Sequence, residues 1–171
     1  LGAGFDTLGC RLSERGARIE VVEIDHPATQ AAKRSAVATL SPPLQAPPRF
    51  IACDLAHEAL PAALMNDPRP TVVVAEGLLM YLGEDRVHRL FDELHALSPA
   101  GVQLVFSHLV RWPDGRAGFR PCSGLVDAWL RWRGEPFTWA LAPSALPALL
   151  SQHGYALLDS ASTDDLAEGV T

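Results

Sequence analysis

The chain has 171 residues, a hydrophobic share of 48%, a charged share of 20% and a formal net charge of −6 at pH 7. This length predicts one domain, residues 1–171, with a sizeable buried core. The negative charge argues against a general nucleic-acid binder, because neutralising phosphates requires a basic surface. No apolar run reaches the ~18 residues of a membrane-spanning helix, so we expect no membrane segment.

The cysteines carry little functional signal. Cys10, Cys53 and Cys122 lie far apart and form no CxxC or Cys/His pattern. This spacing predicts neither a zinc site nor a disulfide framework, and the histidines show no partner spacing typical of a metal site. We therefore expect no metal and a location in the reducing cytoplasm.

The chain alternates short β-type runs with helical stretches. This alternation predicts an α/β fold with a mostly parallel sheet and helices on both faces. The expected strands cover residues 18–25, 49–55, 71–77 and 102–109. The expected helices cover residues 26–40, 56–65, 84–97 and 144–153. The stretch YALLDSAS, residues 155–162, is expected to close the sheet as a strand hairpin.

Candidate ligand-binding residues lie where the expected strands end. The opening stretch LGAGFDT contains a GxG turn at Gly2 and Gly4, and an acid lies at the carboxyl end of each of the next three expected strands: Asp25, Asp54 and Glu76. Ligands of open α/β sheets bind at the carboxyl ends of the strands. These positions therefore predict one binding site at that edge of the sheet. Glu23, on the opposite side of its strand from Ile24, is expected to be solvated.

Two nucleotide-like ligands compete for this turn. Asp25 lies 21 positions after Gly4, near the ~20 expected for a carboxylate that binds a dinucleotide ribose. However, Thr7 stands where the dinucleotide fingerprint has its third glycine, and the carboxylate of Asp6 would repel phosphates at a helix N-terminus. A ligand with a ribose and a cationic head but no phosphate, such as S-adenosylmethionine, fits better. An NAD(P)-dependent oxidoreductase remains the less favoured alternative.

Several motifs together resemble the leucine carboxyl methyltransferase family, most closely its bacterial branch of candidate S-adenosylmethionine-dependent methyltransferases. The motifs are LGAGFDT, EIDHP, the Asp54–Leu55 pair and EGLLMYL, with GEPFTWAL and LLSQHGY further along. Their order and spacing extend the likeness over nearly the whole chain. The resemblance implies a class I methyltransferase fold, which is Rossmann-like with an antiparallel last strand, and S-adenosyl-L-methionine as cofactor.

The resemblance also implies roles for particular residues. Gly2, Ala3 and Gly4 would line the methionine part of the cofactor, and Asp25 would bind its ribose. Asp54 and Leu55 would contact the adenine, and Glu76 would lie near the methionine ammonium. The implied reaction is methyl transfer to a carboxylate, or to a hydroxyl, of an unidentified small-molecule or protein acceptor. A carboxylate is already nucleophilic at neutral pH and needs no general base.

The chain departs from the family at its beginning. The family's N-terminal helical region does not precede Leu1, and the first strand is truncated to Leu1 and the turn. Because the loss of a central strand exposes two unpaired edges, we expect residues 1–171 alone to be unstable or self-associating and to bind the cofactor poorly. A truncated, non-catalytic remnant of such an enzyme is therefore a second alternative.

The acceptor site is expected around the segment 111–135. This segment is locally basic and rich in tryptophan, so it is a candidate insert that holds an anionic acceptor, although a solvated helical hairpin explains its composition equally well. Arg120 and Arg131 are its candidate acceptor-binding residues. Tyr81 and His108 are further candidates, because both follow expected strands at the same edge of the sheet.

Overall fold

The structure of the protein is a computed structural model that describes residues 1–14, 19–111, 132, 137–162 and 165–166. The strands are β1 (Val22–Asp25), β2 (Arg49–Ala52), β3 (Thr71–Ala75) and β4 (Val102–Phe106). The α-helices are α1 (Leu8–Glu14), α2 (Pro27–Ala38), α3 (Glu84–His95) and α5 (Leu146–Gln152). Single 3-10 turns occur at Ala62–Leu64, Leu79–Tyr81 and Pro143–Ala145. The expected alternation of strands and helices is confirmed.

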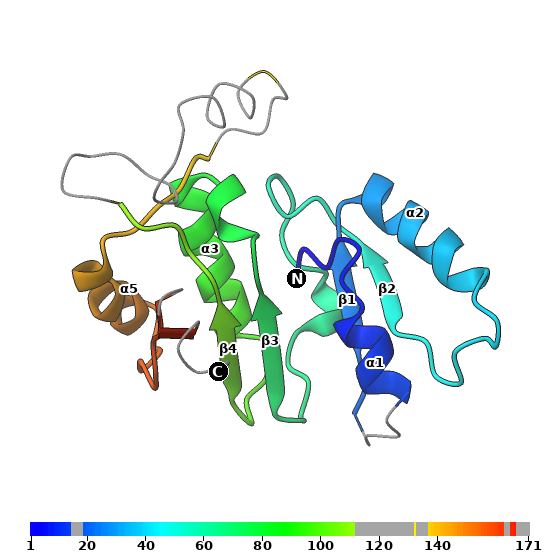
Figure 1. The fold of residues 1–171 in the computed structure, drawn as a ribbon. Coiled ribbons are helices and arrows are strands. Elements are labelled where there is room, and N and C mark those ends of the chain that lie inside the picture. Colours follow the sequence, from blue (N-terminus) through cyan, green and yellow to red (C-terminus); the bar gives the residue numbers. More distant parts are fainter. Residues whose placement is uncertain (15–18, 112–131, 133–136, 163–164, 167–171) are drawn as a thin grey trace.

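The strands form two parallel pairs with the start of the chain between them (Figure 1). In β1 and β2, Val22 lies opposite Arg49, and in β3 and β4, Thr71 lies opposite Val102. The nitrogen of Leu1 donates to the carbonyl of Val74 in β3 at 2.7 Å. The next amide, that of Gly2, donates to the carbonyl of Ile24 in β1 at 2.8 Å. Leu1 and Gly2 thus lie between β1 and β3 and form a hydrogen bond to each.

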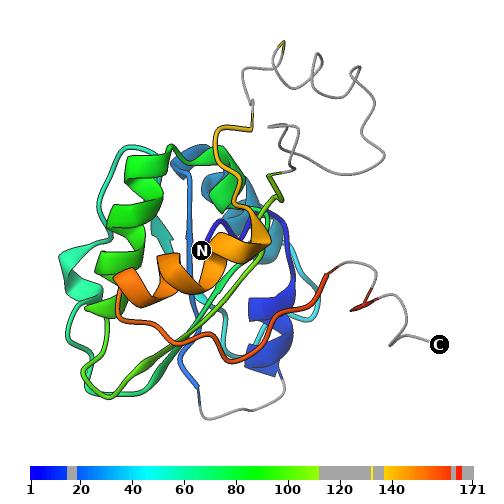
Figure 2. The same cartoon turned by 90° about the vertical axis from the view of Figure 1, so that its left-hand side faces the viewer.

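Helix α3 supplies much of the hydrophobic core. Its apolar residues recur at helical spacing and are almost fully buried: Val87, Leu90, Phe91 and Leu94. The ring of Phe91 meets the ring of Phe106 in β4 edge to face at 5.5 Å. Figure 2 shows α3 and α1 on opposite sides of the strands, which agrees with the expected helices on both faces. No helix in the described ranges is long and apolar enough to span a bilayer.

Helix α2 is held to β1 by polar contacts. It begins at Pro27, and the side chain of His26 accepts a hydrogen bond from the Ala28 amide as an N-terminal cap. The Gln30 side chain donates to the carbonyl of Glu23 at 2.9 Å, and Lys33 forms a buried ion pair with the Glu23 carboxylate at 2.6 Å. The expectation that Glu23 is solvated is therefore wrong, because both faces of this parallel strand are covered.

Two expected elements are absent. Residues 56–65 do not form a helix, because Pro61 interrupts the segment and only the turn Ala62–Leu64 is helical. Residues 155–162 form no strand either, so the antiparallel last strand does not form there. After Tyr155, whose ring still meets that of Phe91 edge to face at 5.9 Å, the chain leaves the core and Leu158 is 81% exposed. This segment makes no ladder hydrogen bond to another described residue, and a strand requires such a partner.

Candidate functional site

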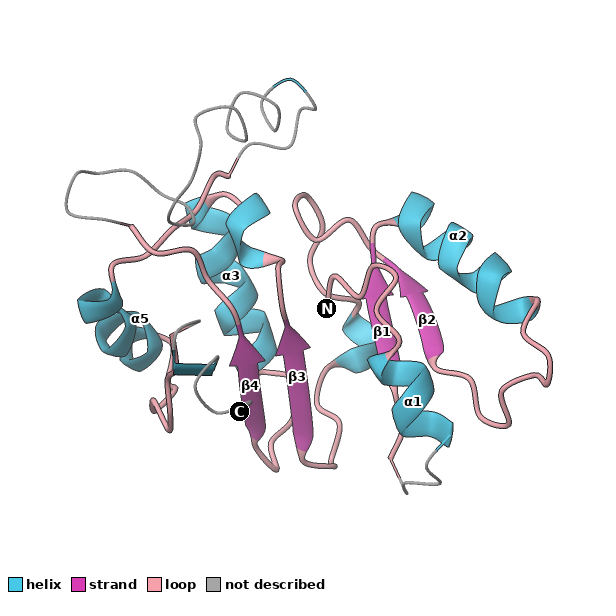
Figure 3. Cartoon of the chain, viewed as in Figure 1, coloured by secondary structure: helices cyan, strands magenta, loops and turns pink. Residues whose placement is uncertain are grey.

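The expected site residues gather where the strands end. Asp25 is the last residue of β1, Asp54 lies two residues beyond β2, and Glu76 directly follows β3. All four strands point the same way in Figure 3, and the glycine turn lies at their carboxyl ends. The structure therefore brings the turn and the three acids to one edge, as the sequence predicted.

The glycine turn depends on its glycines. Gly2 and Gly4 have φ angles of +58° and +47°, which are strained for residues with a side chain. A Cβ atom on Gly2 would also lie only 3.0 Å from Cδ1 of Leu78. The turn is closed by a hydrogen bond from the Asp6 amide to the carbonyl of Ala3 at 2.9 Å. The conformation of this turn therefore requires glycine at both positions.

Asp25 is bonded to the turn through its carboxylate. Its Oδ2 accepts a hydrogen bond from the Gly4 amide, and its Oδ1 accepts one from the His26 amide at 2.6 Å. An ionised carboxylate has about four lone-pair sites, so each oxygen retains one for another donor. The half-buried Asp25 can therefore fix the turn and also accept hydrogen bonds from the two hydroxyls of a ribose.

Asp54 is a half-buried hydrogen-bond acceptor beyond β2. Its Oδ2 lies 2.8 Å from Nδ1 of His57, and its Oδ1 accepts a hydrogen bond from the Ala56 amide at 3.1 Å. The hydrogen bond from His57 holds the pKa of Asp54 below its ordinary value. Asp54 therefore stays ionised at neutral pH, and both of its oxygens act as hydrogen-bond acceptors. Leu55 is buried in the core at 5% exposure, so its side chain does not line the edge.

Beyond β3 and β4, the two parallel strands are linked at their ends. The Gly77 amide donates to Oγ of Ser107 at 2.8 Å, and the exposed Glu76 lies just before it. His108 is half-buried, and its Nδ1 lies 3.1 Å from the carbonyl oxygen of Leu109. If Nδ1 carries the proton there, Nε2 of the neutral ring is free to act as a base.

The candidate acceptor residues are only partly described. Tyr81 is 42% exposed, and its ring lies 5.7 Å from that of Phe137. Arg120 and Arg131 lie outside the described residues. At the base of the segment 111–135, the Arg111 amide donates to the carbonyl of Leu141 at 3.0 Å. This contact joins the first residue of the segment to the chain that follows it.

Arg86 is a structural residue that the sequence analysis missed. Its guanidinium lies on the buried side of α3 and donates to the carbonyls of Leu55 at 2.7 Å and Glu58 at 2.9 Å. It also pairs with Glu93 at 2.9 Å, and Glu93 in turn accepts the Leu60 amide at 2.9 Å. Arg86 thus fastens the loop that carries Asp54 to α3. The sequence did contain a signal for this role, because Arg86 lies at helical spacing from Leu90 and Glu93 on the apolar side of the helix.

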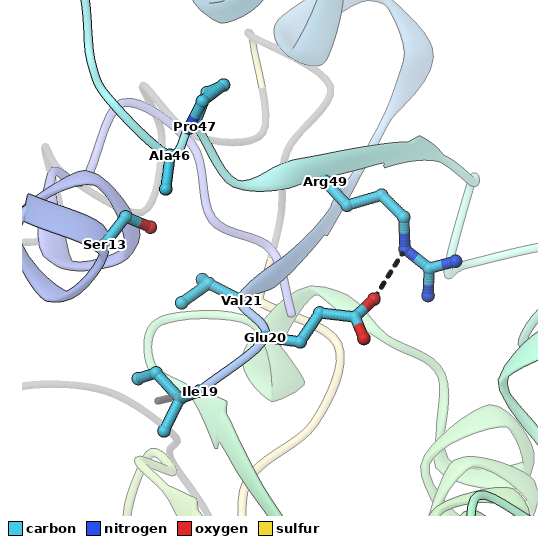
Figure 4. Close-up of a pocket in the computed structure, with 7 residues that line it drawn as sticks. All are labelled: Ser13, Ile19, Glu20, Val21, Ala46, Pro47 and Arg49. Atoms are coloured by element: carbon cyan, nitrogen blue, oxygen red, sulfur yellow. Dashed lines mark ion pairs between the residues drawn. The ribbon is translucent and has the colours of Figure 1, made fainter. Parts of the chain in front are cut away.

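A separate hollow lies at the other end of β1 and β2. It has a volume of about 370 Å³ and is lined by Ser13, Ile19, Glu20, Val21, Ala46, Pro47 and Arg49 (Figure 4). Its residues precede the strands, whereas ligands of open α/β sheets bind beyond the strands' carboxyl ends. It is therefore not the candidate site. The described residues also contain no cluster of three or more His, Cys, Asp or Glu side chains that could hold a metal ion.

Solved structures of similar fold define the class of protein. LaPhzM superimposes with a TM-score of 0.61 at 17% identity, over 93% of this chain and 44% of that chain. The magnesium protoporphyrin IX methyltransferase ChlM from Synechocystis PCC 6803, solved with bound SAH, gives a TM-score of 0.57 at 16% identity, over 94% and 64%. LepI in complex with SAM gives 0.60 at 15% identity, over 93% and 37%. The fold is that of the class I S-adenosylmethionine-dependent methyltransferases.

Sequence comparison then gives the family. A protein of Mycolicibacterium smegmatis, named as a candidate S-adenosyl-L-methionine-dependent methyltransferase, is 39% identical over 140 residues, which are 80% of this chain and 44% of that protein. A similarly named protein of Mycobacterium avium is 39% identical over 121 residues, 68% of this chain and 38% of its own. The model of leucine carboxyl methyltransferases matches residues 1–95. The chain belongs to the leucine carboxyl methyltransferase family, and it spans less than half the length of these relatives.

Proposed function

We propose that the protein is an S-adenosylmethionine-dependent O-methyltransferase that acts on a carboxylate, with a hydroxyl acceptor as the alternative. One observation carries the proposal: the Asp25 carboxylate is bonded to the Gly4 amide at the carboxyl ends of the strands. This contact joins a ribose acceptor to a glycine turn that a cofactor can approach closely. The family of the chain and the class of its fold support the same reading.

The residues of the site fit this cofactor. Gly2, Ala3 and Gly4 would line its methionine part, Asp25 would accept its ribose hydroxyls, and Asp54 would accept its adenine amine. Leu55 would contribute only through its backbone, since its side chain is buried. Glu76 would face the ammonium group of the methionine. Every charged side chain in this set is anionic, which suits a ligand with a sulfonium and an ammonium and no phosphate.

Asp6 argues against a dinucleotide. Its Oδ1 accepts the amide of Leu8 at 2.9 Å, so its carboxylate occupies the N-terminal end of α1. In dinucleotide-binding folds, the pyrophosphate lies at the corresponding helix N-terminus. A pyrophosphate there would displace this hydrogen bond and face a negative charge.

Methyl transfer to a carboxylate requires no general base from the protein, because the carboxylate is already nucleophilic. When bound, S-adenosylmethionine supplies a methyl group on a positively charged sulfur, which is a good leaving group. The residues of the site would then orient the two reactants and exclude water. A hydroxyl acceptor would need a base, for which His108 and Tyr81 are the candidates.

The product chemistry tests the proposal. We would incubate the protein, at its natural length, with methyl-labelled S-adenosylmethionine and cell extract and identify methylated products by mass spectrometry. A carboxylate acceptor gives a methyl ester that releases labelled methanol in base, whereas a hydroxyl acceptor gives a base-stable ether. Base-labile product supports the proposal, and stable product selects the hydroxyl alternative. Absence of any product, with the cofactor bound, would identify a non-catalytic member of the family.

The segment 111–135 is the proposed acceptor-binding part of a single domain, residues 1–171. We expect Arg120→Ala with Arg131→Ala to raise the KM for the acceptor about tenfold or more, because an arginine–carboxylate pair contributes more than 1 kcal/mol when partly desolvated. The Kd for the cofactor should stay within about twofold. Equal weakening of both constants would contradict this assignment. We place the enzyme in the cytoplasm, where the buried free thiols of Cys10 and Cys53 stay reduced.

A further inference from the structure

A buried ion pair lies next to the glycine turn. Nζ of Lys33 in α2 is 2.6 Å from Oε2 of Glu23 in β1, and the two side chains are only 6% and 7% exposed. Removing two charges from water is costly, and apolar residues of the same size often give equal or higher stability. The pair therefore calls for an explanation other than packing.

The same ammonium group also contacts the turn. Nζ of Lys33 donates a hydrogen bond to the backbone carbonyl of Asp6 at 2.6 Å. Asp6 in turn closes the turn through its amide and caps α1 through its side chain. Lys33 is thus a fixed donor that connects α2, β1 and the segment after Gly4. An apolar side chain in its place would fill the volume but leave the Asp6 carbonyl without this partner.

The position of Glu23 relates the pair to Asp25. Residues 23 and 25 are two apart in a strand, so their side chains leave the same face of β1. Helix α1 packs directly on the Glu23 carboxylate, since a Cβ on Gly9 would lie 2.3 Å from its Oε1. The ion pair and the Asp25 carboxylate therefore hold the same turn from neighbouring positions on one face.

We propose that Lys33 is a positioning residue for cofactor binding: it fixes the carbonyl of Asp6 and so keeps the Gly4 amide directed at Asp25. Glu23 holds the Lys33 side chain in place through their ion pair. This inference rests on the proposed function, because it assigns the turn to the cofactor. Lys33 touches no reacting atom, and its role is to keep the turn in its binding conformation before the cofactor arrives.

The first test removes the donor. Calorimetry of the natural-length protein with S-adenosylhomocysteine should show a Kd at least about tenfold weaker for Lys33→Met, as expected for loss of a hydrogen bond from a charged donor. Arg34→Met is the matched control. This substitution also removes one positive charge from α2, but Arg34 is exposed. It should bind as the wild type does. Unchanged affinity in Lys33→Met would overturn the inference.

The second test separates positioning from stability. Glu23→Leu combined with Lys33→Met replaces the pair with apolar groups and should unfold near the wild-type temperature. We expect this double variant to bind S-adenosylhomocysteine as weakly as Lys33→Met does. We also expect its Gly4 amide to exchange hydrogen faster than that of the wild type, both with and without the ligand. If the double variant regains wild-type affinity for S-adenosylhomocysteine and wild-type protection of the Gly4 amide together with wild-type stability, the role of Lys33 is only structural. If the wild type itself fails to bind S-adenosylhomocysteine, the proposed function fails, while the exchange data still decide whether Lys33 orders the turn.

Discussion

Gly2 illustrates what a single residue of the motif contributes. The GxG pattern predicted a turn at this position, and its φ of +58° confirms the need for glycine there. The second constraint, Cδ1 of Leu78 at 3.0 Å from a Cβ on Gly2, has no signal in the sequence. It comes from a residue 76 positions away that the fold brings onto the turn.

Gly2→Ala should lower the free energy of unfolding by about 1–3 kcal/mol, because it combines a strained φ with a close contact. Gly77→Ala is the matched control. Gly77 has a similar φ of +63° but nothing within 4 Å of its Cβ position. Gly77→Ala should therefore lower the free energy of unfolding by less than Gly2→Ala does. Urea unfolding of both variants measures the difference. Equal losses would show that the Leu78 side chain moves aside without an energetic penalty and that the destabilisation comes from the backbone angle alone.

At the same scale, the acids divide into those that sequence reasoning placed correctly and one that it did not. Asp25, Asp54 and Glu76 were placed at the ends of strands by the pattern of apolar runs, and the structure confirms those positions. Glu23 was expected in solvent but is 5% exposed. The alternation in a strand says which side chains share a face. It does not say that α2 covers that face with Lys33.

At the scale of elements, periodicity predicted where β3, β4 and α3 begin and extended each of them about two or three residues too far. It failed for residues 56–65, where Pro61 and the turn after Asp54 prevent a helix. It failed again for residues 155–162, since a strand depends on a partner that local sequence does not specify. In the first case the loop is held instead by Arg86, whose contacts come from α3.

Arg86→Ala should therefore destabilise the protein by about 3 kcal/mol, because it leaves Glu93 without its cation and two backbone carbonyls without donors. Arg89→Ala is the control, since Arg89 is exposed on the same helix and should change stability by less than about 0.5 kcal/mol. Thermal unfolding measures both. If Arg86→Ala lost no more stability than the control, the loop after β2 would keep its conformation without the contacts of Arg86.

At the scale of the molecule, the first residues of the chain lie between the two parallel strand pairs and form hydrogen bonds to both. Leu1 donates to β3 and Gly2 to β1, so the glycine turn lies where both pairs end. The sequence predicted this edge as the site because the glycine turn and the acids at the ends of the next three strand runs fall there. The acceptor could not be predicted, because its candidate segment, 111–135, has a composition that suits a lid and a solvated hairpin equally.

The central claim is that the turn and Asp25 together bind the nucleoside of S-adenosylmethionine and reject a dinucleotide. Calorimetric titration of the natural-length protein with S-adenosylhomocysteine and with NAD+ tests it most directly, alongside Asp25→Ala and the exposed control Asp85→Ala. We predict that the wild type and Asp85→Ala bind S-adenosylhomocysteine and not NAD+, and that Asp25→Ala binds it at least about tenfold more weakly. Binding of NAD+, or an unchanged affinity in Asp25→Ala, would contradict the account.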